Sequence, residues 1–315
     1  MQELIMLIGL PGSGKSTLAS KIAKDCRNYI VVSTDSVRKE IYGDEAIQGD
    51  GNKVFERAYA LIDYYLRDGY SVIFDATNVR RKSRKAFIER FKKWKDLRII
   101  FHAILVATSY EICLENNLKR RRVVPEEVIK RMFCNFEVPM KFEGWDRIDV
   151  ESYHGSIVKS YVSYRQYLYS RNNIPHDCEP WHTGTISDHI YAVISEVGKD
   201  KILSKEEEEF YLMVAAWHDV GKFYVKAYNE KKGRCTYYNH NNTSAYCYCA
   251  KGGDVNLDIA FVIEKHMEAH KYDSDQECYD ALSKQGIDCD LILAIIRFGD
   301  YDSAGALAVP GTELK

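Results

Sequence analysis

The chain has 315 residues, a formal net charge of −2 at pH 7 and 46% hydrophobic residues. This length exceeds the size at which a single hydrophobic core usually stops growing, so we expect two domains. The composition is that of an ordinary soluble globular protein, and it excludes disordered and collagen-like chains.

We expect neither a signal peptide nor a membrane span in this sequence. The start, MQELIMLIGLPG, holds one short apolar run without the basic region and cleavage site of a signal peptide. No run approaches the roughly 18 apolar residues that span a bilayer. The nine cysteines are scattered, and the CYC at 247–249 lacks the spacing of a zinc site. An odd cysteine count beside a nucleotide-type motif favours reduced thiols and a cytoplasmic location.

Short apolar runs alternate with amphipathic stretches from residue 4 to about 150. The predicted strands are 4–9, 29–33, 71–75, 99–106 and an edge strand at 143–151. This alternation predicts a parallel sheet flanked by helices, an α/β domain that we place at residues 1–153.

The pattern becomes helical after this region, at 156–170 and from 186 onward, with a loop or short hairpin expected at 226–242. We therefore predict an all-α second domain over residues 154–315. Seven of the nine histidines lie between 176 and 270, inside this domain.

The segment GLPGSGKS matches the full P-loop pattern and directly follows the first predicted strand. Backbone N–H groups of such a loop cradle phosphates, the lysine reaches the β and γ oxygens, and the serine hydroxyl holds Mg²⁺. We therefore expect ATP or another NTP to bind with Mg²⁺. The predicted nucleotide-binding residues are Gly9, Gly12, Ser13, Gly14, Lys15, Ser16 and Thr17.

The second predicted strand ends in VVSTDSVR, which puts Asp35 at the carboxyl edge of the sheet, where open α/β sheets bind their ligands. A carboxylate there can accept the proton of an attacking hydroxyl. Arg38, one helical turn further on, can pair with a substrate phosphate. The alternative is that Asp35 caps the following helix, since Ser33, Thr34 and Asp35 are all good capping residues.

The third predicted strand ends in FDATN, so Asp75 and Asn78 are expected at the same edge, with Asp75 acting on the Mg²⁺ or its water shell. The basic stretch 80–98 follows. Such a run is usually a solvated face, but beside a phosphoryl-transfer site it is also a candidate nucleic-acid track. The cations within 116–132 are typical of a mobile lid that neutralises the transferring phosphoryl group.

The segments GLPGSGKST, STDSVR, DATN and RRRVVPEEVIKRM, in this order over residues 5–150, resemble the 5′-hydroxyl polynucleotide kinase family of P-loop proteins. The resemblance implies that Asp35 is the general base, that Arg38 binds the substrate phosphate, and that Lys15 and Ser16 bind ATP and its metal.

The lid signature of that family, Asn-x-x-Arg, can be aligned in two registers. It falls either on Asn116 with Lys119 or on Asn117 with Arg120. We take Arg120 and Arg122 as the lid cations that the resemblance implies at the transition state.

The segment WHDVGKF puts His218 directly before Asp219, and at the end of a helix these two side chains can converge on one ion. A lone histidine on an amphipathic helix is more often a packed core residue than a ligand. Here a set is present, and imidazoles with carboxylates and no cysteine suit Mn, Fe, Co, Ni or Zn. The further candidate ligands are His189, His240, His266 and Asp300.

The order and spacing of these residues over about 176–305 resemble the HD phosphohydrolase superfamily, with HDVGK as the most recognisable piece. The resemblance implies Lys222 as a phosphate contact. It also implies one or two divalent transition metals, and the ligands of the first are His189, His218, Asp219 and Asp300. His240 and His266 match the additional histidines of family members that bind two metals.

His182, in PWHTG, has three interpretations. It replaces His189 as a metal ligand, contacts the substrate, or lies in a turn.

The two resemblances together imply an enzyme that heals nucleic-acid ends. A 5′-kinase and a metal-dependent 3′-phosphatase or 2′,3′-cyclic phosphodiesterase would prepare a break for a separate ligase, and we favour RNA over DNA as the substrate. One alternative is a small-molecule kinase fused to a nucleotidase. Another is a nucleotide-dependent switch with a degenerate metal domain.

Overall fold

The computed structural model describes residues 2–94, 97–151, 170–177 and 182–306. The chain divides into two compact units. The first comprises Met1–Met132 and Pro139–Gly155, and the second comprises Phe133–Val138 and Ser156–Lys315. The short segment Phe133–Val138 therefore packs with the second unit, although it precedes the boundary expected between residues 153 and 154.

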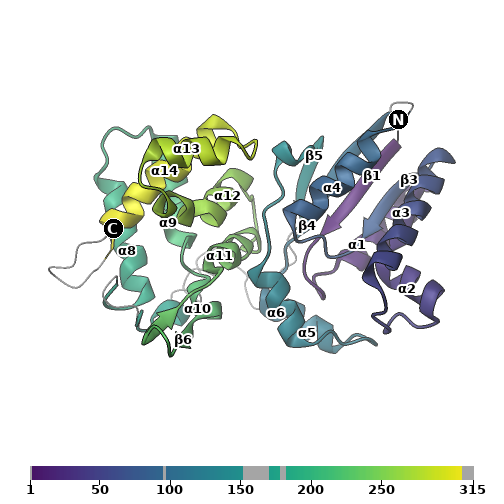
Figure 1. The fold of residues 1–315 in the computed structure, drawn as a ribbon, viewed down its shortest axis with the longest axis horizontal. Helices are drawn as coiled ribbons and strands as arrows, with labels where there is room; N and C mark the ends of the chain where they lie inside the picture. Colours follow the sequence, from purple (N-terminus) through teal and green to yellow (C-terminus); the bar gives the residue numbers. More distant parts are fainter. Residues whose placement is uncertain (1, 95–96, 152–169, 178–181, 307–315) are drawn as a thin grey trace. The chain divides into compact units, whose positions relative to one another are not determined.

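The first unit contains a five-stranded sheet in the order β2-β3-β1-β4-β5 (Figure 1). All neighbouring strands are parallel, as the sequence predicts. The strands are β1 (Gln2–Ile8), β2 (Tyr29–Ser33), β3 (Ser71–Asp75), β4 (Ile99–Val106) and β5 (Arg147–Glu151). The edge strand is shorter than the 143–151 expected, because Lys141–Glu143 forms the 3-10 turn η1.

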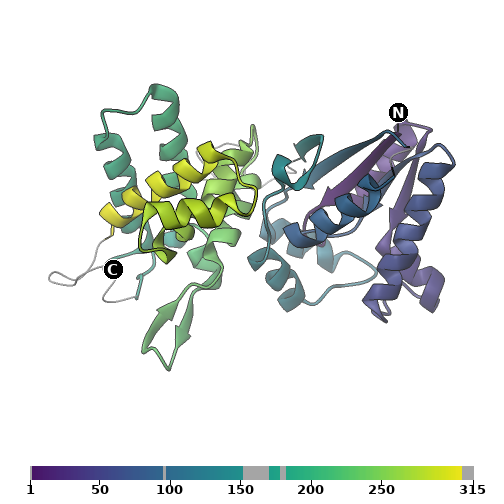
Figure 2. The same cartoon turned by 45° about the horizontal axis from the view of Figure 1, so that its top comes forward.

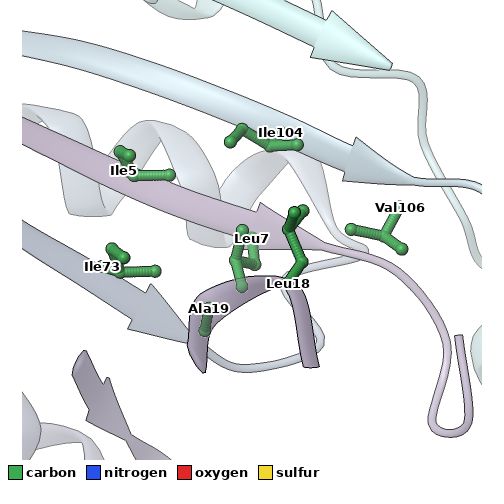
Figure 3. Packing of buried hydrophobic residues seen from close by; sticks show 7 residues of the cluster. All are labelled: Ile5, Leu7, Leu18, Ala19, Ile73, Ile104 and Val106. Atoms are coloured by element: carbon green, nitrogen blue, oxygen red, sulfur yellow. The ribbon is translucent and has the colours of Figure 1, made fainter. Parts of the chain in front are cut away.

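Helices cover both faces of this sheet, which explains why its strands are nearly continuous apolar runs. The helices are α1 (Lys15–Asp25), α2 (Thr34–Tyr42), α3 (Gly51–Arg67), α4 (Arg81–Lys92), α5 (Tyr110–Leu118) and α6 (Glu126–Cys134). On one face, Leu18 and Ala19 of α1 pack on alternate residues of the central strands, including Ile5 and Leu7 (Figure 3). On the other face, Phe74 stacks on Phe87 of α4 with ring centroids 5.3 Å apart.

The second unit is helical, with one short hairpin that projects from the helices in Figure 2. The helices are α8 (Ile186–Lys199), α9 (Lys205–Trp217), α10 (Lys222–Val225), α11 (His240–Cys249), α12 (Leu257–Lys265), η2 (His266–Lys271), α13 (Asp275–Ser283) and α14 (Cys289–Ala304). The hairpin joins β6 (Ala227–Asn229) to β7 (Arg234–Thr236), which is the second of the two structures expected at 226–242. The helix expected at 156–170 lies, except for its last residue, outside the described residues.

Local capping explains where two of these helices begin. The Thr185 hydroxyl accepts from the backbone N–H of Asp188 at the start of α8, and Ser204 does the same for Glu207 at the start of α9; both are capping boxes. Helices α8 and α9 pack on each other, as do α11 and α12. Within the described part of the chain, no helix combines the length and apolar character needed to cross a membrane.

The segment Phe133–Val138 is held in the second unit by aromatic and polar contacts. Phe133 lies edge-on to Tyr224 and to Tyr246, with ring centroids 5.1 Å and 5.3 Å apart. The backbone N–H of Val138 donates to the buried Glu264 carboxylate at 2.6 Å. These contacts explain why the segment belongs to the second unit although β5 of the first unit follows it in the chain.

Candidate active sites

The P-loop connects the end of β1 to the start of α1, as the sequence predicts. Gly12 has φ 84°, and a Cβ atom there would lie 2.1 Å from the carbonyl oxygen of Cys113, so only glycine fits. Lys15 is buried, and its Nζ donates to the carbonyl oxygen of Leu10 at 2.7 Å. Burial lowers the pKa of Lys15 to about 8, and the nearby Asp75 carboxylate opposes this shift.

Two oxygen ligands suitable for Mg²⁺ lie together at this edge of the sheet. The Ser16 hydroxyl, on the first turn of α1, donates to Oδ2 of Asp75 at 2.7 Å. Asp75 ends β3 and is 6% exposed, so it lies at the mouth of the loop and is screened from bulk water. A hydroxyl and a carboxylate from neighbouring elements are the protein ligands that Mg²⁺ commonly takes beside a nucleotide.

Three arginines surround the Asp35 carboxylate. Oδ1 lies 2.6 Å from Nη1 of Arg38 and 2.9 Å from Nη1 of Arg122, and Oδ2 lies 3.4 Å from Nη2 of Arg120. Ser33 is the N-cap of α2, because its hydroxyl accepts from the backbone N–H of Asp35. The capping alternative for Asp35 is therefore wrong, and its side chain is available to the arginines.

The lid segment is fixed by both of the asparagines in its signature. Asn116 donates to the carbonyl oxygen of Gly12 at 3.0 Å. Asn117 donates to the carbonyl oxygen of Val124 at 2.8 Å and accepts from its backbone N–H at 3.0 Å. Lys119 is exposed, whereas Arg120 reaches Asp35, so the register that aligns the signature with Asn117 and Arg120 brings its cation to the site.

A cavity of about 970 Å³ connects these groups. It is bounded by the P-loop, the ends of β2 and β3 and the lid. Its charged and polar lining includes Lys15, Asp35, Arg38, Asp75, Arg120 and Arg122. Gly14, Ser16 and Thr17 also line it, while Gly9 and Ser13 are not among its lining residues. A nucleotide and part of a second substrate fit a pocket of this size.

Asn78 and two arginines of the basic helix α4 make contacts within the first unit. Asn78 adopts φ 49°, which asparagine tolerates, and its amide donates to the carbonyl oxygen of Leu7 at 2.8 Å, so it shapes the turn after β3. Arg84, in the basic helix α4, is fully buried and forms two 2.7 Å bonds to Glu143. Arg90 lies over the Tyr59 ring. Arg84 is thus committed to an internal ion pair, whereas Arg90 is exposed, and the nucleic-acid track along this helix stays a prediction.

In the second unit, four of the sequence-predicted histidines share one bonding pattern. In each imidazole, Nδ1 bonds to a backbone carbonyl: His189 to Gly305 at 3.2 Å, His218 to Ala215, His240 to Tyr237 and His266 to Ile263, each of the last three at 2.8 Å. A carbonyl can only accept, so each Nδ1 carries a proton and each Nε2 presents its lone pair. Metal-binding histidines are oriented in this way.

The four Nε2 atoms face one another in two pairs. Nε2 of His189 lies 3.2 Å from that of His218, and Nε2 of His240 lies 3.1 Å from that of His266. Nitrogen ligands lie about 2.1 Å from an ion, so two ligands of one ion are about 3 Å apart. Two facing lone pairs repel each other, and a cation between them would remove that repulsion.

The Asp219 carboxylate lies between these pairs and is 1% exposed. Its Oδ2 is 3.4 Å from Nε2 of His189, and its Oδ1 is 3.2 Å from Nε2 of His240. No donor in the described residues reaches either oxygen with hydrogen-bond geometry. Burial would raise the pKa of Asp219, but the Lys222 ammonium, 2.6 Å from Oδ2, holds it well below its usual range, so it stays a carboxylate.

This donor set fits divalent metal ions. The described residues form two groups whose ligand atoms lie close enough to hold an ion, His189 with His218 and Asp219, and Asp219 with His240 and His266. Asp219 is common to both, so its two oxygens could each serve one ion. Four imidazoles and one carboxylate suit Mn, Fe, Co, Ni or Zn.

The C-terminal acidic residue of the cluster is Asp302, and the prediction of Asp300 from the sequence is wrong. Asp302 Oδ1 lies 3.0 Å from Nε2 of His189, and Oδ2 lies 2.9 Å from Nε2 of His270. Asp300 is exposed. Both are on α14, and two residues correspond to about 200° around a helix, so only one of them can face the cluster. His270, which the sequence analysis did not single out, orients Asp302.

Lys222 lies beside the cluster, as the HD resemblance implies. Its Nζ is 2.6 Å from Asp219 Oδ2 and 3.1 Å from Nε2 of His176. Packing explains the glycine of HDVGK, since a Cβ atom on Gly221 would lie 2.3 Å from the carbonyl oxygen of His240.

His182 stacks on His176, a histidine that was not predicted as a site residue, with ring centroids 4.3 Å apart. Burial, reinforced by Lys222, lowers the pKa of His176, and it lowers that of His182 to about 3.

The sheet, the loop and the flanking helices define the first unit as a P-loop kinase-like α/β domain. In agreement, residues 4–139 match a family profile described as an AAA domain.

Two curated proteins illustrate the similarity. The L-seryl-tRNA(Sec) kinase of Methanococcus maripaludis is 31% identical over 157 residues, which cover 47% of this chain and 57% of that protein. The bifunctional polynucleotide phosphatase/kinase of Schizosaccharomyces pombe is 27% identical over 153 residues, which cover 47% of this chain and 33% of that protein. The chain thus spans little more than half of the first relative and a third of the second.

Among solved structures, the Pnkp1/Rnl/Hen1 RNA repair complex is similar at 22% identity and a TM-score of 0.37, covering 42% of this chain and 42% of that chain. A fungal RNA kinase is similar at 14% identity and a TM-score of 0.37, covering 54% of this chain and 43% of that chain.

Proposed function

We propose that this chain heals nucleic-acid ends, with an ATP-dependent 5′-hydroxyl kinase in the first unit and a metal-dependent phosphohydrolase acting on 3′-phosphate or 2′,3′-cyclic phosphate ends in the second. The observation that carries the proposal is that one chain holds both the P-loop cavity around Asp35 and the His/Asp cluster around Asp219. We favour RNA as the substrate. The products, a 5′-phosphate and a 3′-hydroxyl, are the ends that a separate ligase joins.

In the kinase, Asp35 is the group that accepts the proton of the attacking 5′-hydroxyl. It lies at the carboxyl edge of the sheet in the same cavity as Lys15. Its three arginine neighbours can bind the acceptor phosphate, through Arg38, and the transferring phosphoryl group, through Arg120 and Arg122. Ser16 and Asp75 would hold Mg²⁺ with the nucleotide.

In the hydrolase, His189, His218, Asp219 and Asp302 would hold one ion, and Asp219, His240 and His266 a second. Such ions, when bound, supply an activated water and stabilise charge on the phosphoryl oxygens. The carbonyl partners of the four Nδ1 atoms fix the imidazole orientations, and the Lys222 ammonium provides a positive charge for the phosphate. The burial of His218 and Asp219 excludes bulk water from the cluster.

The test uses an RNA oligonucleotide that carries a 5′-hydroxyl and a 3′-phosphate. Lys15→Ala should lose 5′ phosphorylation and keep 3′ dephosphorylation, and Asp219→Ala should show the reverse. Chelation with EDTA followed by addition of Mn²⁺, Ni²⁺ or Zn²⁺ should remove and restore the 3′ reaction. A Lys15→Ala protein with full kinase activity, or an Asp219→Ala protein with full phosphatase activity, rules out the corresponding assignment.

A second candidate is a kinase for a different acceptor, fused to a nucleotidase. It is favoured by the range of curated relatives, which includes 6-phosphofructo-2-kinase 1 of Saccharomyces cerevisiae, 28% identical over 120 residues. Phosphate transfer from ATP to matched acceptors, an RNA oligomer and a mononucleoside, separates the two candidates. A higher kcat/KM for the mononucleoside selects the second.

A further inference from the structure

We propose that His176 and His182 form, with Lys222, a phosphate-binding wall beside the metal cluster, and that the two histidine Nδ1 atoms donate hydrogen bonds to the oxygens of a phosphate ester. The inference rests on the phosphohydrolase part of the proposed function and adds to it the residues that hold the substrate phosphate.

The two rings are arranged differently from the metal-ligand histidines. They stack at 4.3 Å with 23° between their planes, and His182 also lies edge-on to His189, with ring centroids 4.6 Å apart. Among the described residues, neither belongs to a group whose ligand atoms could share one ion. Their Nδ1 atoms are buried and have no hydrogen-bond partner within the described part of the chain, whereas each ligand-type histidine pairs its Nδ1 with a carbonyl.

The bonding of His176 identifies it as a donor. An ammonium group can only donate, so Lys222 Nζ donates to Nε2 of His176 at 3.1 Å, and the ring proton is then on Nδ1. His176 is 1% exposed, so this N–H is withdrawn from bulk water without an acceptor. Buried donors are nearly always satisfied, and one that is not calls for a missing partner.

The missing partner is better described as an anion than as a metal ion. The Lys222 ammonium contacts both His176 and Asp219, and its positive charge opposes a second cation at the stacked pair. The same charge attracts a phosphate oxygen, to which the ring N–H groups can donate. The site adjoins the cluster through Asp219 and His189, so a phosphate held there lies next to the proposed ions.

The segment that carries the two rings is held in position, as a binding site requires. The backbone N–H of His176 donates to the carbonyl oxygen of Gly184 at 2.8 Å, next to a β-bridge between Pro175 and Thr185. Asp177 is bonded to the hairpin region in two ways: its carbonyl oxygen accepts from the backbone N–H of Cys235 at 2.9 Å, and its carboxylate lies 2.7 Å from Nζ of Lys226. The Tyr237 hydroxyl bonds to the His176 carbonyl oxygen.

The test measures binding of inorganic phosphate to the full chain loaded with Mn²⁺, by isothermal titration calorimetry. A Lys15→Ala background removes the contribution of the P-loop. His176→Phe and His182→Phe keep a stacked ring but lose the donor, so each should weaken phosphate binding by about 10- to 100-fold. His182→Asn places an amide N–H donor where Nδ1 lies, so the phosphate affinity of this variant should stay within about 3-fold of that of the parent.

Bound Mn²⁺, counted by elemental analysis, should be unchanged in all the variants, and circular dichroism checks that each is folded. The proposal is overturned if both Phe variants bind phosphate like the parent, if the parent binds none, or if the Phe variants lose Mn²⁺, which would make the histidines metal ligands. These outcomes differ from failure of the proposed function, in which phosphate binds through the two histidines but no phosphate ester is hydrolysed.

Discussion

Substituting Asp300 and Asp302 of α14 by asparagine, one at a time, tests the assignment of Asp302 against that of Asp300. Asp302→Asn removes a buried carboxylate oxygen 3.0 Å from Nε2 of His189 and 3.5 Å from that of His218. Asp300→Asn makes the same chemical change two residues away, on an exposed side chain, and is the matched control.

The expected magnitude follows from the role of the carboxylate. Replacing a partner that only orients a metal ligand typically costs 10- to 100-fold in metal affinity. Loss of a direct ligand should lower metal affinity by at least the upper end of that range. We therefore expect Asp302→Asn to weaken Mn²⁺ binding by about 100-fold, or roughly 2.7 kcal/mol. Asp300→Asn should change it less than about 2-fold, because its carboxylate lies outside the cluster.

The assay is a Mn²⁺ titration followed by electron paramagnetic resonance of the free ion, with thermal unfolding of the metal-free proteins as a check on folding. Equal weakening by both substitutions would refute the placement of Asp302 on the inner face of α14. Weakening by Asp300→Asn alone would restore the ligand expected from the sequence.

Three further predictions concern the first unit. Gly12→Ala should abolish binding of a fluorescent ATP analogue, since its Cβ would lie 2.1 Å from the Cys113 carbonyl oxygen, whereas Gly69→Ala, at an open position with φ 92°, should leave nucleotide affinity unchanged. Glu143→Gln should lower the free energy of unfolding of this unit by about 3–5 kcal/mol in urea, because it removes the carboxylate charge that compensates the fully buried Arg84 guanidinium; retention of the parent midpoint would show that the ion pair is dispensable. Burial lowers the pKa of Lys15 from 10.5 to about 8, so the unfolded chain binds more protons than the folded chain between these two pH values. The free energy of unfolding of the parent, relative to that of Lys15→Met, should therefore rise by up to about 3 kcal/mol from pH 8 to pH 10.5. A difference in denaturation midpoint that stays constant over this range would contradict the prediction.

The sequence predicted the parallel sheet and the P-loop well because both are local patterns. Apolar runs bounded by turn residues mark the strands, and the glycine and lysine spacing of the P-loop is itself the structural requirement, as the close approach of Gly12 to Cys113 shows. Ser16 and Asp75, which are far apart in sequence, could also be placed together, because parallel strands end at one edge.

The contacts that the sequence did not predict depend on side-chain direction and on long-range pairing. The choice between Asp300 and Asp302 needs the rotational phase of α14, which spacing alone does not give. His176 lies in a segment without helical or strand periodicity, and long-range contacts such as the bridge between Pro175 and Thr185 bring it beside the cluster. The burial of Arg84 in a basic helix depends on Glu143, 59 residues away, so charge density alone suggested a solvated face.

Complementation between two variants on one substrate tests the central claim most directly. An RNA carrying a 5′-hydroxyl and a 3′-phosphate is incubated with ATP, Mg²⁺ and Mn²⁺, and the formation of ligatable ends is scored with an added RNA ligase that requires a 5′-phosphate and a 3′-hydroxyl. The account predicts that Lys15→Ala alone and Asp219→Ala alone each yield no joined product, and that mixing them restores it. Failure of the mixture while the parent protein gives joined product, or full joining by either variant alone, would contradict two independent phosphate-handling sites in this chain.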